Sequence, residues 1–466
     1  MGKTGQVVKM TSPHTQSQET TNWNRRLFAL AGPIVLANLS VPLPGIVDTA
    51  VMGHLPDPSG LAAVGLGAMI FSTLYFSFSF LRMSTIGLTA QADGRGDAAE
   101  VRIVLYRGGL IAIALAIIMM VFQDPIGRYA FQLTDATETV QTYGLSYFDI
   151  RIWGAPAALL NLVVLGWMFG FGSMRLPVTI QIVTNLVNVV LDFVFVFGFD
   201  WGIEGVALAT VIGELVGAAL GLYFIARRLR HLGQSLLPDW VSVLEPAGLR
   251  RLFGVNRDLL IRTFCLLIAF AHFKIAGAEL GTVTLAANLV LLIFLDLSSY
   301  GLDAFANAAE ILIGKAVGQR NRAVFLTVTR LSLVWGGLVS LVAVLVFFLF
   351  GNHIVGLMTD QLPVRDVSAN FMLWAAFLPI TAVWAFVLDG IFVGATRSAA
   401  LRNGMLISIA LYFASEWVLT GQFGNDGLWV ALHIFLLARG LTLAVQVPAL
   451  VRSIDTQPPA HAQAVR

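Results

Sequence analysis

Charged residues are scarce in this chain of 466 residues. Asp, Glu, Lys and Arg together make up 12% of the sequence, whereas hydrophobic residues make up 57%, and the mean hydropathy is +0.80. A soluble globular domain carries roughly 25% charged residues. The composition therefore excludes an ordinary soluble protein, and the formal net charge of +2 gives no reason to expect a nucleic-acid partner.

Cysteine is nearly absent, and the histidines do not cluster. The only cysteine, Cys265, has no partner for an intrachain disulfide and lies in an apolar stretch, so we expect it to be a small buried residue. The histidines show no H-x-x-x-H spacing and lie at His14, His54, His231, His272, His353, His433 and His461. Without a metal cluster or a nucleophile paired with a base, we predict that the chain is not an enzyme and needs no cofactor.

Long apolar runs are what the sequence has in abundance. Residues 109–122, 331–350 and 428–450 are examples, and such runs approach the roughly 20 residues that a helix needs to span a bilayer. They are apolar on all faces, unlike the alternating ten-residue strands of a membrane barrel. We therefore predict an all-α polytopic membrane protein.

The runs divide the chain into twelve predicted membrane-spanning helices. Their approximate ranges are 25–53, 60–91, 102–123, 140–170, 177–199, 204–229, 251–278, 282–314, 323–350, 367–394, 399–420 and 426–452. An even number of spans places both chain ends on the same side of the membrane.

Basic residues indicate which side that is. They concentrate in alternate loops and in the two ends, at Lys3, Lys9, Arg25, Arg26, Arg95, Arg102, Arg175, Arg227, Arg228, Arg230, Arg250, Arg251, Arg257, Lys315, Arg320, Arg322, Arg397, Arg402, Arg452 and Arg466. In the intervening loops, Arg128 and Arg365 are the clear exceptions. Because basic loops stay cytoplasmic, we predict a multi-pass protein of a bacterial inner membrane with both termini in the cytoplasm.

The loops also suggest the domain boundaries. We predict a disordered cytoplasmic tail at 1–24, an amino-terminal lobe at 25–229, a linker at 230–250, a carboxy-terminal lobe at 251–452 and a second tail at 453–466. The linker mixes apolar and charged residues, which suits either a short segment in the membrane interface or a plain tether, and the residues leave both interpretations open.

The two halves resemble each other at an offset of 224 residues. Residues 61–63 then align with 285–287, the turn 92–97 aligns with 316–321, and Asp192 aligns with Glu416. The regular order of such matches predicts a tandem duplication of a six-helix unit, whose two copies have the same orientation in the membrane.

Ionisable residues within spans are costly and are therefore candidate functional residues. Asp48 follows Pro42, Pro44 and Gly45 in the first span, and these residues predict a helix that is bent or unwound just before the acid. Freed carbonyl groups beside a carboxylate are suited to bind H⁺ or Na⁺. The alternative is that Asp48 only caps the end of a helix.

The fifth span carries a polar face. Asn185, Asn188 and Asp192 follow one another at spacings of three and four, which places them on one side of a helix. Their oxygens could coordinate Na⁺ or stabilise an acid that gains and loses a proton, and Thr210 could add a hydroxyl ligand. The alternative is that they only connect helices. Glu214 is a further acid, for which we consider Arg82 as a partner.

The second half has its own set of acids. Asp296, Asp303 and Glu310 repeat every seven residues and so lie on nearly one helix face. They form either a stripe that faces a substrate or a neutral network with Lys274. Asp389 is either a second coupling acid or a fixed ion-pair partner.

Four segments resemble the multidrug and toxic-compound extrusion (MATE) family, and within it the DinF-like branch. They are residues 44–55, 188–192, 300–306 and 388–397, and the resemblance extends over about 25–450. It implies two six-helix lobes around a V-shaped central cavity. In that branch an acid of helix 1, an Asn/Asp pair of helix 5 and a hydroxyl of helix 6 form the cation site, and a proline bends helix 1. Asp48, Asn188, Asp192, Thr210 and Pro33 match these positions.

The NorM-like branch instead relies on acids of the carboxy-terminal lobe, including one on helix 7. Here helix 7 has His272 and Lys274 but no acid before Glu279, although Asp389 matches the acid of helix 10. This difference argues against a NorM-type Na⁺ site. We keep Asn185, Asp303, Asp389 and Glu416 as secondary candidates, and Pro33, Pro42 and Pro44 as candidate hinges.

The resulting prediction is a secondary active multidrug efflux transporter. We expect a monomer in the lipid bilayer that exports amphipathic, often cationic organic compounds by alternating access, in exchange for a cation. H⁺ is the expected coupling ion, and Na⁺ at Asp48, Asn188 and Asp192 is the alternative. A competing prediction is a lipid-linked saccharide flippase of the related superfamily, which should have a strongly cationic cavity. A third is a major-facilitator carrier, whose usual basic loop between helices 2 and 3 is not seen.

Overall fold

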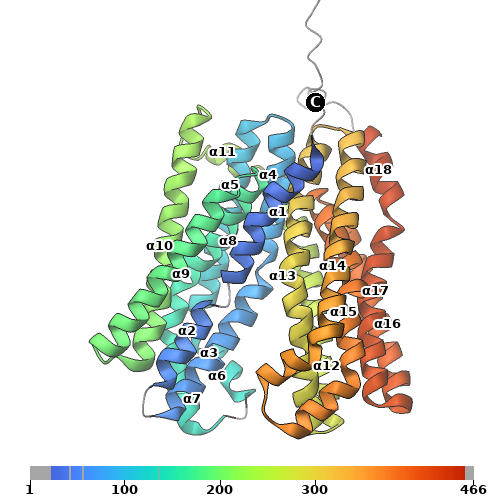
Figure 1. Ribbon diagram of the computed structural model, residues 1–466. Coiled ribbons are helices and arrows are strands. Elements are labelled where there is room, and N and C mark those ends of the chain that lie inside the picture. Colours follow the sequence, from blue (N-terminus) through green and yellow to red (C-terminus); the bar gives the residue numbers. More distant parts are fainter. Residues whose placement is uncertain (1–21, 41–42, 55–56, 135, 457–466) are drawn as a thin grey trace, which may run out of the picture.

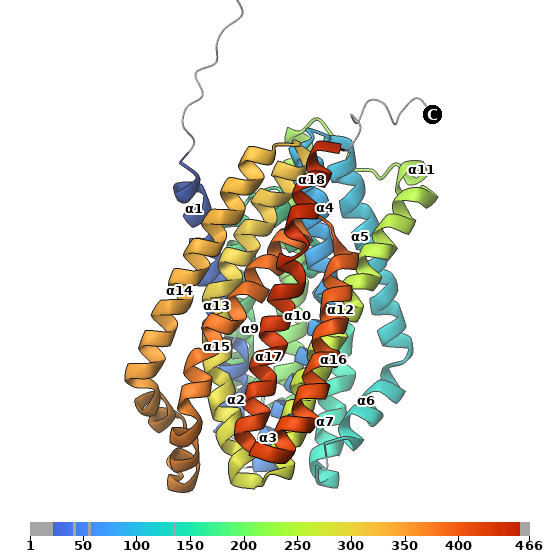
Figure 2. The same ribbon diagram turned by 90° about the vertical axis from the view of Figure 1, so that its right-hand side faces the viewer.

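The computed structural model describes residues 22–40, 43–54, 57–134 and 136–456, and helices dominate these segments (Figures 1 and 2). No β-strand occurs among the described residues. The prediction of an all-α protein is therefore confirmed.

The first lobe is built from the elements that precede the linker. They are α1 (Trp23–Ser40), α2 (Leu43–Gly53), α3 (Pro58–Ser77), α4 (Phe80–Gly94), α5 (Ala98–Val121), α6 (Gln123–Gln132), α7 (Glu138–Arg151), the 3₁₀ turn η1 (Ile152–Gly154), α8 (Ala155–Gly170), α9 (Arg175–Phe193), the π-helical turn η2 (Val194–Gly198) and α10 (Gly202–His231).

The second lobe follows α11 (Trp240–Val243), a single turn in the linker. Its helices are α12 (Pro246–Glu279), α13 (Thr282–Gly318), α14 (Arg322–Met358), α15 (Leu362–Gly394), α16 (Ser398–Phe423), α17 (Asn425–Ala444) and α18 (Val447–Thr456). The two lobes lie side by side, and α1 begins at the same end of the bundle at which α18 ends (Figure 1). We call this the terminal end.

Eleven helical stretches of the described residues are long and apolar enough to cross a membrane. Each coincides with one predicted span from 60–91 onward. The largest difference is at the end of α14, which continues to Met358 because Val355 is buried against the second lobe. The first predicted span, 25–53, corresponds to α1 and α2 together, and residues 41–42 between them lie outside the described residues.

The outer limits of the predicted domains need small changes. Residues 1–21 and 457–466, where most of both predicted tails fall, lie outside the described residues. At the amino-terminal end α1 already begins at Trp23. At the other end α18 runs to Thr456, beyond the predicted limit of 452, because Leu450, Val451 and Ile454 join the apolar cluster that the two lobes share, where α18 packs against α14. Similarly, α12 begins at Pro246, inside the predicted linker.

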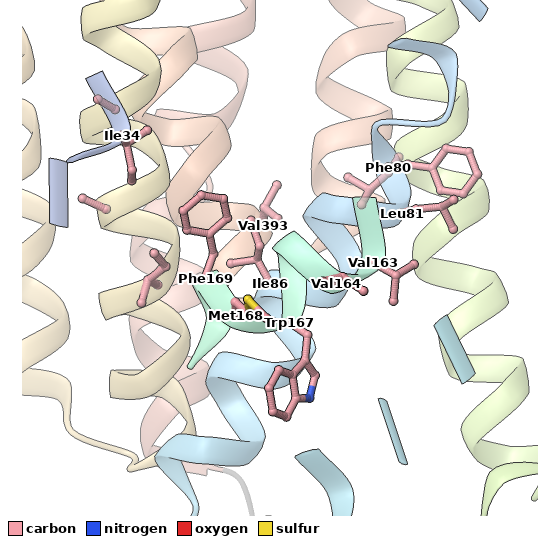
Figure 3. Close-up of a cluster of buried hydrophobic side chains, with 14 of the residues drawn as sticks. Ile34, Phe80, Leu81, Ile86, Val163, Val164, Trp167, Met168, Phe169 and Val393 are labelled. Atoms are coloured by element: carbon pink, nitrogen blue, oxygen red, sulfur yellow. The ribbon is translucent and has the colours of Figure 1, made fainter. Parts of the chain in front are cut away.

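Two large clusters of buried apolar side chains form the hydrophobic cores of the lobes. One includes Cys265, Phe273 and Trp429 and lies wholly in the second lobe, so the prediction of a buried cysteine is confirmed. The other fills the first lobe and also takes in residues of α13 and α15. Figure 3 shows Ile86 of α4 beside Val393 of α15, which come from different lobes. The lobes therefore share part of one core.

Glycines permit this close contact between α4, α13 and α15. A side chain on Gly94 would collide with the backbone of Lys315, and one on Gly318 would collide with the backbone of Gln91. Small residues at helix interfaces let backbones approach in membrane proteins, where van der Waals packing provides much of the association energy.

Candidate functional site

Asp48 and Asp192 meet inside the first lobe. Asp48 lies on α2 and Asp192 on α9, and their side chains are 5% and 0% exposed. Helix α2 packs against α9, and the two carboxyl groups lie near each other. Among the described residues no N–H or O–H group donates to either oxygen of Asp192 or to Oδ1 of Asp48. Two neighbouring carboxylates inside a protein repel each other, which favours a proton on one of the two groups.

Asn188 and Thr210 complete the same region. Asn188 lies one turn before Asp192, and its Nδ2 donates to Thr210 Oγ1 over 3.2 Å. The Thr210 hydroxyl in turn donates to the carbonyl of Val206 over 3.0 Å. The Oδ1 atom of Asn188 is buried and receives no hydrogen bond from a described residue. The region therefore offers several buried acceptor oxygens without donors, an arrangement that suits a proton or a small cation.

Asn185 makes a different set of contacts. Its Nδ2 donates to the carbonyl of Ser40 over 2.9 Å, and its Oδ1 accepts a hydrogen bond from Gln181 over 3.0 Å. Ser40 is the last residue of α1. Asn185 thus attaches the end of α1 to α9, and a part for it in cation binding stays a prediction.

Two of the candidate hinge prolines lie in the first two helices. Pro33 is within the continuous helix α1, and Pro44 is in the first turn of α2. Pro42 lies outside the described residues. Near the end of α1, Asn38 donates to the carbonyl of Tyr300 in α13 over 3.2 Å. The end of α1 is therefore attached to both lobes.

The partner predicted for Glu214 is wrong. Arg151 of α7, not Arg82, forms the ion pair, with 2.8 Å between Nη1 and Oε1. The two side chains are 11% and 13% exposed, and the Arg151 guanidinium lies over the ring of Phe71 at 5.1 Å. Arg151 was not among the candidates predicted from the sequence, although a basic residue within an apolar span is itself a signal.

A cavity of about 610 Å³ lies between the lobes. Elements of both lobes line it, namely α3 and α4 of the first and α12, α13, α15 and α17 of the second. The lining residues that carry charge are Arg82, Arg262, Lys274, Asp296, Asp303, Glu310, Asp389 and Arg439. All three acids that repeat every seven residues on α13 thus face this cavity, together with Lys274.

Asp389 is held by two arginines. Its Oδ2 accepts hydrogen bonds from Arg262 of α12 and from Arg439 of α17, the latter over 2.8 Å. Of the two roles predicted for Asp389, these contacts fit that of a fixed ion-pair partner. Neither arginine was recognised from the sequence as its partner. Arg262 and Arg439 lie within apolar spans, where an unpaired charge is costly, and this signal was available.

Other charges in the cavity have no such partner. Among the described residues no ion pair involves Arg82, Asp303 or Glu310. Oε1 of Glu310 is buried without a hydrogen-bond donor. The cavity therefore presents unpaired charges of both signs to a ligand.

The counterpart of the acid pair in the second lobe is not an acid pair. His272, aligned with Asp48, approaches the hydroxyl group of Tyr412 at 3.4 Å from its Nδ1. Glu416 lies one turn after Tyr412 and does not line the central cavity. The duplicated halves thus differ at these positions.

Polar contacts join the lobes at the terminal end. Lys315 Nζ lies 2.7 Å from Asp93 Oδ2 and donates to the carbonyl of Phe171 over 2.8 Å. Gln91 of α4 donates to the carbonyl of Gly394 over 2.9 Å. Because Lys315 is little more than one turn from Glu310, these contacts close the terminal end of the cavity.

Comparison with known proteins gives the family. The sequence model of the MatE family matches residues 33–194 and again residues 260–418, which together are more than half of the chain. The chain belongs to the MatE family. One match falls in each lobe, which supports the predicted tandem duplication.

Similar bacterial proteins match this chain over nearly its whole length. The DNA damage-inducible protein F of Escherichia coli K12 is 37% identical over 424 residues, covering 91% of this chain and 92% of that protein. The multidrug resistance protein NorM of Vibrio cholerae is 24% identical, covering 95% and 98%. MatE proteins are transporters, so the prediction that the chain is not an enzyme is confirmed, and the major-facilitator alternative is excluded.

Solved structures show the same fold. The bent form of the Vibrio cholerae MATE transporter VcmN gives a TM-score of 0.82 at 20% identity, covering 92% of this chain and 97% of that one. A MOP superfamily transporter of Pyrococcus furiosus, for which a reverse polarity of the binding pocket suggests a different function, gives 0.81 at 16%, covering 93% and 97%. The predicted architecture of two six-helix lobes around a central cavity is thereby confirmed.

Proposed function

We propose that this MatE protein is a secondary active efflux transporter that exports amphipathic, often cationic organic compounds in exchange for H⁺. The carrying observation is the proximity of the buried carboxyl groups of Asp48 and Asp192, which lack hydrogen-bond donors among the described residues. In this proposal a single chain suffices as the transport unit, because one chain supplies both lobes, the acid pair and the cavity.

The geometry of the acid pair favours H⁺ as the coupling ion. A proton on one of the two groups would remove the repulsion between neighbouring buried carboxylates. Loss of the proton would leave two carboxylates that repel each other inside the protein. That repulsion would push α2 away from α9, to which the end of α1 is attached through Asn185 and Ser40. Protonation is in this way linked to the shape of the first lobe, with Pro33 and Pro44 as hinge positions.

The central cavity supports the substrate class. Its volume of about 610 Å³ lies within the roughly 300–1,000 Å³ of pockets for drug-sized ligands. Phe76, Phe270 and Phe386 offer apolar walls, and the carboxyl groups of Asp303 and Glu310 offer partners for an organic cation. These are the features that an amphipathic cation requires.

Orientation and alternating access follow from the distribution of charge and contacts. We propose that the terminal end faces the cytoplasm of a bacterial cell, because the basic loops lie there. The contacts of Lys315 and Gln91 at that end then describe a conformation closed toward the cytoplasm. Export requires a second conformation in which they separate.

The test is transport in proteoliposomes of a fluorescent organic cation under an imposed pH gradient or an imposed Na⁺ gradient. We expect Asp48→Asn and Asp192→Asn to abolish transport driven by the pH gradient while the proteins still fold. Asp149→Asn is the matched control, since Asp149 is an exposed acid of the same lobe. Full pH-driven transport by Asp48→Asn would refute the proposal, and transport driven by Na⁺ alone would favour the Na⁺ alternative.

A lipid-linked saccharide flippase is the second candidate. It would require a strongly cationic cavity to bind phosphate groups. The cavity is instead lined by four basic and four acidic residues, and two of the basic ones are engaged by Asp389. The charge balance therefore favours the efflux transporter.

A further inference from the structure

The linker between the lobes exposes an unusual group of apolar side chains. Leu237, Trp240, Val241 and Leu244 are 77%, 52%, 86% and 53% exposed, and we call them the linker surface. They lie between the end of α10 at His231 and the start of α12 at Pro246, outside the membrane-spanning stretches. No other segment between spans at the terminal end exposes a large apolar side chain among the described residues.

The linker is held firmly against the first lobe. The buried side chain of Arg107 on α5 donates to the carbonyl groups of Val243 and Ser242 over 2.9 and 2.6 Å and to Glu245 over 3.2 Å. The Val243 side chain is fully buried, and Tyr106 donates to the carbonyl of Leu236 over 2.5 Å. These contacts exclude a plain tether. They also fix which side of the linker points outward.

The position of the linker surface matches the edge of a membrane. In Figure 2, α11 lies at the outer edge of the bundle, at its terminal end, level with the ends of spanning helices. A rigid apolar surface at this level contacts the boundary between acyl chains and headgroups. Tryptophan prefers that boundary, and Trp240 belongs to the linker surface.

Exposed arginines flank the linker surface on both sides along the chain. Arg227 and Arg230 are in the last turns of α10, and Arg250 is in the second turn of α12. Glu245, which lies between them, is paired with Arg107. Asp239, the other acid of the linker, accepts a hydrogen bond from the Ser242 hydroxyl group over 2.5 Å. An apolar surface flanked by arginines has the chemistry that binds anionic lipid headgroups.

We propose that the linker surface docks into the cytoplasmic leaflet and binds anionic phospholipid. The lipid charge is complementary to the flanking arginines, and the acyl region covers the apolar side chains. The linker is the covalent connection between α10 of one lobe and α12 of the other. Anionic lipid therefore acts where the two lobes are joined, and we expect it to change the rate at which they rearrange. The inference rests on the proposed orientation of the terminal end.

The test measures the depth of the linker surface in the full-length protein. Cys265→Ser removes the only cysteine, and Val241→Cys then carries a nitroxide label at a position exposed enough to tolerate it. Gln319→Cys is the matched control, because Gln319 is an exposed polar residue of the turn after α13 at the same end. In vesicles of phosphatidylethanolamine and phosphatidylglycerol, we expect the label at 241 to be accessible to oxygen and shielded from a water-soluble nickel complex. The control should show the reverse.

The contribution of lipid charge is measured with the same label. We expect a shallower position in phosphatidylcholine vesicles, and also in the double variant Arg227→Gln/Arg230→Gln. Each basic residue near an anionic surface strengthens the attraction to the membrane, so loss of two should increase the nickel accessibility of the label at 241. A label at 241 as accessible to nickel as that at 319 would overturn the proposal, and so would a depth independent of lipid charge. Because the measurement needs no substrate and no ion gradient, its outcome is distinguishable from failure of the transport proposal.

Discussion

Lys315 joins the lobes at the closed end of the cavity, and its replacement by methionine is predicted to open that end. The side chain makes two contacts across the interface, an ion pair with Asp93 at 2.7 Å and a hydrogen bond to the carbonyl of Phe171 at 2.8 Å. Methionine keeps the length and the apolar part of lysine but makes neither contact. The variant thus removes the polar contacts and leaves most of the packing.

The magnitude follows from the exposure of the partners. The side chains of Lys315 and Asp93 are 27% and 26% exposed, so solvent screens their attraction and the pair contributes about 0.5–1 kcal/mol. A hydrogen bond from a charged group adds about 1.5 kcal/mol. The sum of about 2 kcal/mol corresponds to roughly a 30-fold shift in the equilibrium between the closed and open forms of this end.

The assay is a distance measurement between two spin labels. Ala99 and Ala323 are exposed residues in the first turns of α5 and α14, one in each lobe. Each follows the turn that connects its helix to α4 or α13 at the closed end. In the Cys265→Ser background, labels at these positions report the separation of the lobes. We expect one short distance in the parent protein and a large population at longer distance in Lys315→Met.

Two controls decide the interpretation. Lys315→Arg keeps the charge and the donors, so it should restore the short distance. Gln319→Met changes an exposed neighbour whose side chain makes no hydrogen bond or ion pair with a described residue of the first lobe, so it should leave the distance unchanged. The reasoning is refuted if Lys315→Met shows the parental distance, or if Gln319→Met opens the end equally.

Two further predictions concern packing inside and between the lobes. Arg151→Met leaves the buried carboxylate of Glu214 without its partner, and we expect the free energy of unfolding to fall by about 3–5 kcal/mol. In a thermal unfolding assay in detergent, the double variant Arg151→Met/Glu214→Met should recover most of this loss. A double variant as unstable as Arg151→Met alone would contradict the prediction. Gly318→Val places a side chain against the backbone of Gln91, so we expect the closed form and transport to be lost, whereas Gly337→Val, which meets no atom within 4 Å, should transport normally.

The twelve spans could be predicted because the bilayer imposes a simple rule. Every backbone polar group in the hydrocarbon must be satisfied within its own segment, so a long apolar run becomes a helix. Local departures from a continuous α-helix were not predicted, such as the boundary between α3 and α4 and the 3₁₀ turn η1 before α8. The break that the prolines around residue 42 predict falls at residues 41–42, outside the described residues.

The polar face of α9 could also be predicted, because helical spacing alone places Asn188 beside Asp192. Their meeting with Asp48 came from the family resemblance. The residues themselves indicated only that each acid was a candidate. Packing of α2 against α9 brings the two carboxyl groups near each other.

Ion-pair partners could not be predicted. Glu214 binds Arg151, 63 positions away, and Asp389 binds Arg262 and Arg439, 127 and 50 positions away. At such separations the sequence offers several basic residues in neighbouring spans, and no spacing rule distinguishes them. The expected pair of Glu214 with Arg82 was wrong because α4 directs Arg82 into the cavity, while α7 packs beside α10.

The sequence by itself determined that the chain crosses the membrane as helices, in two similar halves, with costly polar groups at particular depths. Those properties follow from the short range of helical hydrogen bonds and from the free energy of transferring each side chain into lipid. Tertiary structure alone decided which charges meet, that the cavity carries unpaired groups of both signs, and that Arg107 turns an apolar side of the linker outward. These depend on contacts between segments distant in the chain, which only the packing of complete helices can select.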